Sequence, residues 1–372
     1  MPSRLQLLHA WQRQLRTLAP DVRATRVANL ARITVGLLWA GTVSLPVIAA
    51  ALPVPACDAS LERRLRRWLA NTAVVVGEMW TPLLPHLLEG TAGQELVLVF
   101  DPTPQNDHAT ILVVGIVQHR RVLPVAWRVA PQQDGPWPEQ QNTYLRAMMT
   151  EVDQALPPDC VVTLLADRAI TRAEVVDLCR ALGWHYVLRV NTGPKQSHRV
   201  RGADMPERAL WDLITAPGQR WTGRVAVFKA AGWRTVELTI HWRRQADEPW
   251  VLISDRAAGS DRVREYRRRM CCEATYQDCK TRGFNMERSK LTDLARLDRL
   301  LLALHLALWW GMQLGLRVIR TGQRRRFDRT DRRDLSVLHL GRTVLRDDLE
   351  RDRCPPLPFH QRGDQWRYAW LA

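Results

Sequence analysis

The sequence contains few cysteines and none of the spacings in which cysteines commonly bind zinc. Its seven cysteines are an odd number in a chain of 372 residues, and no two of them form a CxxC pair. A disulfide framework requires cysteines that can all be paired, and a zinc site requires clustered cysteine and histidine ligands, so neither feature is indicated. This cysteine usage fits a protein of a reducing cytosol best.

Long apolar runs are also scarce. The residues after Met1 lack the apolar core of a signal peptide. The longest apolar stretch, residues 300–316, contains His305 and Gln313 and is slightly short for a membrane-spanning helix. We therefore expect it to form a helix buried in a soluble core, and we expect no membrane partner.

Acidic residues are fewer than basic ones. The 38 aspartates and glutamates stand against 54 lysines and arginines, which gives a net charge of +16. Nearly all the cations are arginine, because lysine occurs only at Lys195, Lys229, Lys280 and Lys290. A surplus of this size predicts a polyanionic partner, and nucleic acid is the commonest one. The apolar fraction of 46% suffices for the core of one large domain or of two to three modules.

One short segment carries four different polar groups on one face of an expected helix. Tyr266, Arg269, Glu273 and Lys280 follow one another at intervals of three, four and seven residues. At about 100° per residue, these side chains project within an arc of about 60°. A carboxylate flanked by cations suits a site that holds a divalent metal against a polyanion, with Glu273 as ligand and the two cations on phosphates. A solvated charged face is the simpler alternative.

The residue pattern changes from helical to β near residue 95. The expected strands are residues 96–101, 109–119, 121–130, 160–167 and 185–190, and the helices between them are residues 142–156 and 171–182. This order is that of a ribonuclease H-like core, an α/β fold with a mixed sheet flanked by helices. Its first and fourth strands are neighbours, so we expect their terminal residues, Asp101 and Asp167, to lie side by side. Aspartate is also common in ordinary turns after strands.

The spacing Y-x2-R-x3-E-x6-K over residues 266–280 resembles the signature of the insertion-sequence-four family of DDE transposases. Asp101-Pro102-Thr103 and Asp167-Arg168 are similar to the two aspartate motifs of that family. The resemblance implies that Asp101, Asp167 and Glu273 are the catalytic residues and bind two Mg²⁺ ions, for which Mn²⁺ can substitute. It also implies cut-and-paste transposition of an insertion sequence, by hydrolysis of DNA ends and strand transfer through a hairpin.

The same resemblance implies partners and contacts. Double-stranded DNA, as terminal inverted repeats and as target, is the expected partner of a homodimer in the bacterial cytoplasm, associated with the nucleoid. Tyr266, Arg269 and Lys280 are expected to contact the phosphate near the cleaved end, and Arg168 is a further candidate contact. Two alternatives remain open, namely a metal-dependent nuclease of the same fold and a DNA-binding protein that no longer cuts.

The remaining segments complete the expected organisation. We expect a helical DNA-binding domain in residues 1–90, the two parts of the catalytic core in residues 91–192 and 251–318, a β-rich insertion subdomain in residues 193–250, and a basic C-terminal region in residues 319–372. The basic stretch 320–333 is either a DNA-contacting loop or a solvated linker.

Two weaker DNA-binding candidates lie outside the core. A helix after Ser60 carries Arg63, Arg64 and Arg67 around an apolar stripe, which is compatible either with a helix-turn-helix-like DNA reader or with a solvated basic helix. Within the insertion, Trp242 is the candidate for stacking on a flipped base, as the resemblance implies, and a packed sheet tryptophan is the alternative.

Overall fold

The computed structural model describes residues 2–132, 139–191 and 199–359 of the chain. The described α-helices are α1 (Pro2–Leu18), α2 (Ala24–Ala40), α3 (Leu45–Ala51), α4 (Asp58–Ala70), α5 (Val76–Trp80), α6 (Leu84–Leu88), α7 (Glu139–Ala155), α8 (Ala173–Ala181), α9 (Ser260–Arg267), α10 (Cys271–Gln277), α11 (Leu294–Arg320) and α12 (Val337–Glu350). The strands are β1 (Glu95–Gln105), β2 (Ala109–Gln118), β3 (Arg121–Pro131), β4 (Val161–Ala166), β5 (His185–Arg189), β6 (Arg199–Val200), β7 (Arg208–Ala209), β8 (Arg220–Val227), β9 (Arg234–His241) and β10 (Trp250–Ser254).

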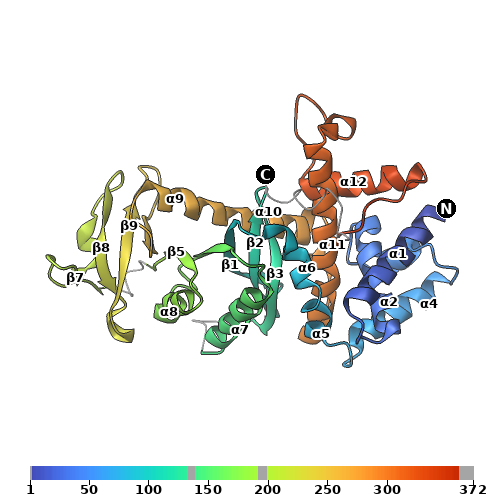
Figure 1. The fold of residues 1–372 in the computed structure, drawn as a ribbon, viewed down its shortest axis with the longest axis horizontal. Helices are drawn as coiled ribbons and strands as arrows, with labels where there is room; N and C mark the ends of the chain where they lie inside the picture. Colours follow the sequence, from blue (N-terminus) through green and yellow to red (C-terminus); the bar gives the residue numbers. More distant parts are fainter. Residues whose placement is uncertain (1, 133–138, 192–198, 360–372) are drawn as a thin grey trace.

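Eight of the strands form one mixed sheet in the order β3-β2-β1-β4-β5-β10-β9-β8. β1, β4 and β5 are parallel neighbours, whereas β2 and β3 continue from β1 as an antiparallel meander. Figure 1 shows β1, β2 and β3 in the middle of an elongated molecule, with the N-terminal helices at one end and β8 and β9 at the other. The first five strands of this order, β3-β2-β1-β4-β5, are arranged as in a ribonuclease H-like core, so the predicted fold class is confirmed.

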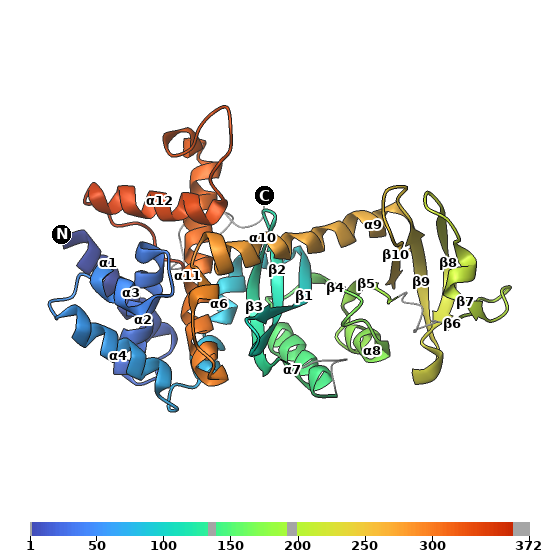
Figure 2. The ribbon, with the colours of Figure 1, turned by 180° about the vertical axis from the view of Figure 1, so that it is seen from behind.

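Alternation along β1 determines which face of the sheet its side chains meet. Leu98 and Phe100 belong to the main core, which also contains residues of α7 and α8. Val97 and Val99 point to the opposite face and pack with residues of α9 and α10. Asp101 follows in the same alternating series, so its carboxylate lies beneath α9 and α10. These two helices, joined through residues 268–270, run as one rod across the sheet (Figure 2).

The strand that carries Asp101 is longer than the sequence predicts. We expected it to end at Asp101, but β1 continues to Gln105, which pairs with Ala109 of β2. On its other side, β1 loses its partner after Phe100, because the last rung with β4 joins Phe100 to Ala166. Residues 101–105 therefore lie at an edge of the sheet on that side. Pro102 and Pro104 lack an N–H group, and an edge strand tolerates this loss because its outer side forms no hydrogen bonds with another strand.

The β-rich segment predicted between residues 193 and 250 continues the core sheet. β9 pairs with β8 on one side and with β10 on the other, and β10 pairs with β5 of the core. A small second sheet, formed by β6 and β7, accompanies this extension. The insertion and the core are therefore joined by continuous backbone hydrogen bonding.

The long apolar segment near residue 300 forms the central helix α11. Among the described helices, α11 is the single one that is long and apolar enough to cross a bilayer by itself, and α2 with α3 passes that test only as a pair bent by 91°. In α11, 83% of the most apolar window is buried inside the protein. The prediction of a helix buried in the core is confirmed, and α11 packs between the sheet and the N-terminal helices (Figure 1).

Close contact between α11 and α12 depends on glycine. A Cβ atom added at Gly341 would lie 1.8 Å from the carbonyl oxygen of Gly311, and one at Gly315 would lie 2.0 Å from that of Val337. Both neighbours are backbone atoms, which cannot rotate away. We expect Gly341→Ala to lower the free energy of unfolding by about 1–3 kcal/mol, measured by urea denaturation. Gly77→Ala is the control, because a Cβ there meets nothing within 4 Å; equal stability of the two variants would contradict the close packing.

Candidate active site

Asp101 is a nearly buried carboxylate beneath α10. The whole Asp101 residue is 7% exposed, and Arg269 donates a hydrogen bond to Oδ1 of the carboxylate. The hydroxyl of Tyr276 donates to the backbone oxygen of Asp101 at 3.2 Å, and the thiol of Cys272 lies beside the carboxylate. Burial raises the pKa of Asp101, although Arg269 opposes that shift. A desolvated carboxylate of this kind gains most from a cation placed next to it.

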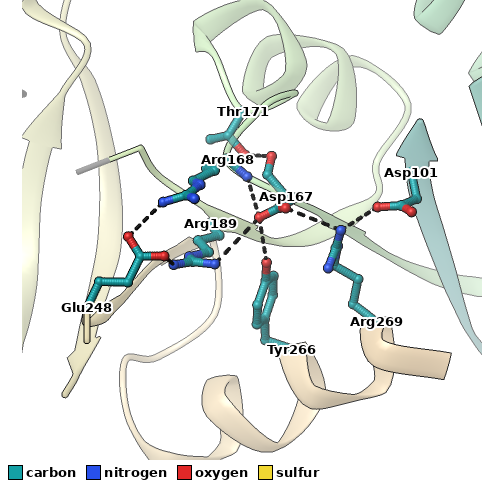
Figure 3. A network of polar contacts seen from close by, with 8 residues as sticks. All are labelled: Asp101, Asp167, Arg168, Thr171, Arg189, Glu248, Tyr266 and Arg269. Carbon is teal, nitrogen blue, oxygen red and sulfur yellow. Dashed lines mark hydrogen bonds and ion pairs between the residues drawn. The ribbon is translucent and has the colours of Figure 1, made fainter. Parts of the chain in front are cut away.

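Asp167 follows the last residue of β4 and is surrounded by donors. Its Oδ1 accepts hydrogen bonds from the backbone N–H of Arg168 at 2.7 Å and from the hydroxyl of Tyr266 at 3.2 Å. Its Oδ2 accepts a hydrogen bond from Arg269 at 3.2 Å, and Arg189 lies 3.8 Å from Oδ1. Figure 3 shows these groups converging on Asp167 from β4, β5 and α9. The carboxylate is therefore in contact with two guanidinium groups.

Arg269 joins the two aspartates. A single nitrogen, Nη2, donates both to Asp101 and to Asp167 (Figure 3). Burial disfavours its charged form, but the two carboxylates outweigh that effect and the pKa of Arg269 is raised. The guanidinium thus reduces the repulsion between two carboxylates that the parallel pairing of β1 and β4 places at the same level.

Tyr266 supports this arrangement as a neutral donor. It is only 1% exposed, and its ring packs edge-on against Trp250 with 5.1 Å between ring centroids. Burial, and then the charge of Asp167, raise the pKa of the Tyr266 phenol. The phenol consequently keeps its proton and donates it in the hydrogen bond to Asp167.

An outer carboxylate completes the network. Glu248 accepts hydrogen bonds from Arg168 at 2.7 Å and from Arg189 at 2.5 Å. Neither Arg189 nor Glu248 was predicted from the sequence. Arg189 ends β5, the parallel neighbour of β4, so the strand-end rule that selected Asp167 would also have selected it. Glu248 lies in the connection between β9 and β10, for which no sequence pattern exists.

The other two groups of the signature helix differ in their surroundings. Lys280 donates a hydrogen bond to the carbonyl oxygen of Pro104, at the end of β1, and burial lowers the pKa of Lys280. Glu273 is an exposed residue of α10, one helical turn after Arg269. Throughout the described part of the chain, no three histidine, cysteine, aspartate or glutamate side chains form a group that could hold a metal ion. The structure therefore brings Asp101 and Asp167 together without Glu273.

The DNA-binding candidates outside this site lie apart from it. Arg63 and Arg67 are exposed and Arg64 is half-buried on α4, at the N-terminal end of the molecule (Figure 1). That helix begins at Asp58, so Ser60 lies within it and does not cap it. Trp242 is half-buried, and its indole N–H donates to the carbonyl oxygen of Ala246 at 2.8 Å.

Comparison with known proteins identifies the class to which the central part of the chain is similar. Residues 139–310 match the family described as Transposase DDE domain. The matched segment contains Asp167 and the whole segment 266–280, and it begins after Asp101. Among solved structures, the chain is similar to the piggyBac transposase in a synaptic complex with hairpin DNA, at 11% identity and a TM-score of 0.46, over 92% of this chain and 78% of that chain. No curated protein sequence matches the chain.

Proposed function

We propose that the protein is a DNA transposase of the insertion-sequence-four family that cuts and joins DNA ends. The observation that carries this proposal is the meeting of Asp101 and Asp167 beneath Arg269 and Tyr266. The match of residues 139–310 to the transposase DDE domain supports it independently. In this proposal, residues 1–90 bind DNA, the partner is the terminal inverted repeats and target DNA, and two copies of the chain act together.

The proposed cofactor is Mg²⁺, which Mn²⁺ can replace. Asp101 and Asp167 fit a hard divalent cation, because they present carboxylate oxygens on neighbouring strands and one of them is desolvated. Together with Glu273 they would hold the metal, which when bound would activate the attacking oxygen and stabilise the leaving 3′-oxygen. Arg269, which already contacts the two carboxylates, is in position to meet the phosphate that approaches them.

The remaining groups of the site orient its parts. Tyr266 fixes the Asp167 carboxylate by donating a hydrogen bond to it. Lys280, which donates to the carbonyl oxygen of Pro104 in β1, would contact the phosphate near the cleaved end together with Tyr266 and Arg269. Water is the nucleophile of the first step, which breaks a phosphodiester bond and frees a 3′-hydroxyl. This hydroxyl then attacks a second phosphodiester and displaces its 3′-oxygen, and attack on the opposite strand closes a DNA hairpin.

A non-cutting DNA-binding protein is the second candidate function. The observation that favours it is the placement of Arg269 between the two aspartates while Glu273 is exposed on α10. A guanidinium in this position satisfies both carboxylates without a metal. This second candidate predicts binding of DNA ends with no cleavage.

One experiment separates these functions. Purified protein is incubated with Mg²⁺ and labelled DNA that carries the terminal repeats flanking its own coding sequence. Cleavage at the repeat ends followed by joining supports the transposase. Binding without cleavage supports the second candidate, and degradation of any DNA supports a nuclease of the same fold. Either of the last two outcomes overturns the proposed function.

A further inference from the structure

The helical rod of α9 and α10 borders two basic depressions that neither Asp101 nor Asp167 lines. The larger one has a volume of about 690 Å³ and lies between the β2–β3 turn, α10 and the connection from α11 to α12. The smaller one, of about 160 Å³, lies between α9 and the strands β8 and β9. Arg267 lines both of them, so the two depressions adjoin at this side chain of the helical rod. We call this surface the outer groove.

Arginine provides most of the charge of the outer groove. Its arginines are Arg120, Arg121, Arg267, Arg324 and Arg333 in the larger part and Arg220, Arg264 and Arg267 in the smaller part. Asp334 is the single acidic residue among the residues that line the two depressions. It is paired with Arg332 at 2.6 Å. The groove therefore carries a large surplus of positive charge.

Several of these cations are available to a ligand. Arg120, Arg267 and Arg333 are exposed, and no ion pair joins any of the three to an acidic residue of the described chain. By contrast, Arg121 is paired with Asp278 at 2.7 Å and Arg324 with Asp328 at 2.6 Å. The paired arginines fix the walls of the groove, while the unpaired ones remain to neutralise a polyanion.

The groove has the length of a short stretch of nucleic acid. From Gly259 to Ala274, its two ends on the rod, the helix rises by about 22 Å at about 1.5 Å per residue. That length corresponds to about six base pairs of double-stranded DNA. Unpaired arginines along such a path match the repeating phosphates of a DNA backbone better than they match a single small anion.

We propose that the outer groove binds the backbone of a double-stranded DNA segment that is separate from the segment at Asp101 and Asp167. The two surfaces use different residues of the same helical rod, because Tyr266 and Arg269 contact the aspartates whereas Arg267 lines the groove. The inference rests on the proposed function only in taking DNA as the polyanion. The protein then holds two stretches of duplex at once, one at Asp101 and Asp167 and one in the outer groove.

The test measures DNA binding in the presence of EDTA, so that cleavage does not contribute. The full-length chain is titrated with a 20-base-pair duplex of arbitrary sequence at about 50 to 200 mM salt. Replacing Arg267 and Arg333 by glutamine should make the slope of log K against log salt shallower by about 2, since each phosphate contact contributes about 0.9. The control, Arg146→Gln with Arg296→Gln, removes the same charge at exposed arginines of α7 and α11 and should leave most of the slope unchanged.

A second readout does not depend on the arginine variants. Cys271 lines the outer groove, whereas Cys354 is exposed beyond α12. Bound duplex should slow alkylation of Cys271, relative to that of Cys354, several-fold. Equal slopes for the two double variants, no protection of Cys271, or equally tight binding of polyglutamate would each overturn the inference. Because none of these measurements involves cleavage, the inference can survive a failure of the proposed chemistry, and the reverse also holds.

Discussion

We expect Asp101→Asn and Asp167→Asn each to lower the rate of DNA-end cleavage by about 10³-fold or more. Each substitution replaces a charged oxygen ligand by a neutral amide at the position where the cation is proposed to bind. A bound divalent metal supplies several kcal/mol of transition-state stabilisation, and about 1.4 kcal/mol corresponds to a factor of ten in rate. Glu273→Gln should have an effect of similar size, although Glu273 lies apart from the aspartates. The measurement is single-turnover cleavage of labelled terminal DNA.

Asp261→Asn is the matched control for these variants. Asp261 is exposed in the first turn of α9, where it pairs with Arg264. Its removal changes the charge by the same amount, on the helical rod that also carries Glu273, and should leave cleavage within about two-fold of the original rate. If the aspartate variants cleave as fast as this control, the site assignment is wrong. If Glu273→Gln alone cleaves normally, the site uses only the two aspartates.

We also expect Arg269→Gln to lower the free energy of unfolding by about 3–5 kcal/mol at neutral pH. The substitution removes the guanidinium between Asp101 and Asp167 and leaves two carboxylates without their shared partner. Burial already raises the pKa of Asp101, and loss of Arg269 raises it further. A carboxyl whose pKa is raised by folding destabilises the folded state when it is ionised, so protonation relieves the loss as the pH falls.

The pH dependence distinguishes this effect from a simple loss of packing. The difference in unfolding free energy between Arg269→Gln and the unmodified protein should shrink in mildly acidic buffer, when measured by urea denaturation at both pH values. Arg268→Gln provides the control, because Arg268 is exposed and adjacent in the chain. A loss of equal size at both pH values would show that Arg269 acts by packing and does not compensate the aspartates.

The order of the core strands could be predicted from the sequence because each strand is a short apolar run bounded by turn residues. The neighbouring positions of Asp101 and Asp167 followed from that order and from parallel pairing alone. The burial of α11 followed from its composition. These features depend on local periodicity and on general rules of sheet topology, which a single sequence contains.

Other features of the site depend on contacts between distant segments. The spacing of the signature predicted that Arg269 and Glu273 share a face of the helix, but it could not show that Arg269 would turn inward to two aspartates while Glu273 stays exposed. Likewise, the extension of β1 past Asp101 is maintained by β2, whose register no local pattern specifies. Whether Arg269 or solvent contacts the two aspartates depends on the packing of distant segments, which exists only in the folded structure.

The position of β10 in the sheet fixes the distance between β4 and β8. β10 is hydrogen-bonded to β5 on one side and to β9 on the other, so β8 lies four strand spacings from β4. At about 4.8 Å per spacing, this amounts to about 19 Å. The separation between β8 and the strand that leads to Asp167 is therefore set by backbone hydrogen bonds, which stretch very little. Adjusting that separation requires insertion or removal of a whole strand.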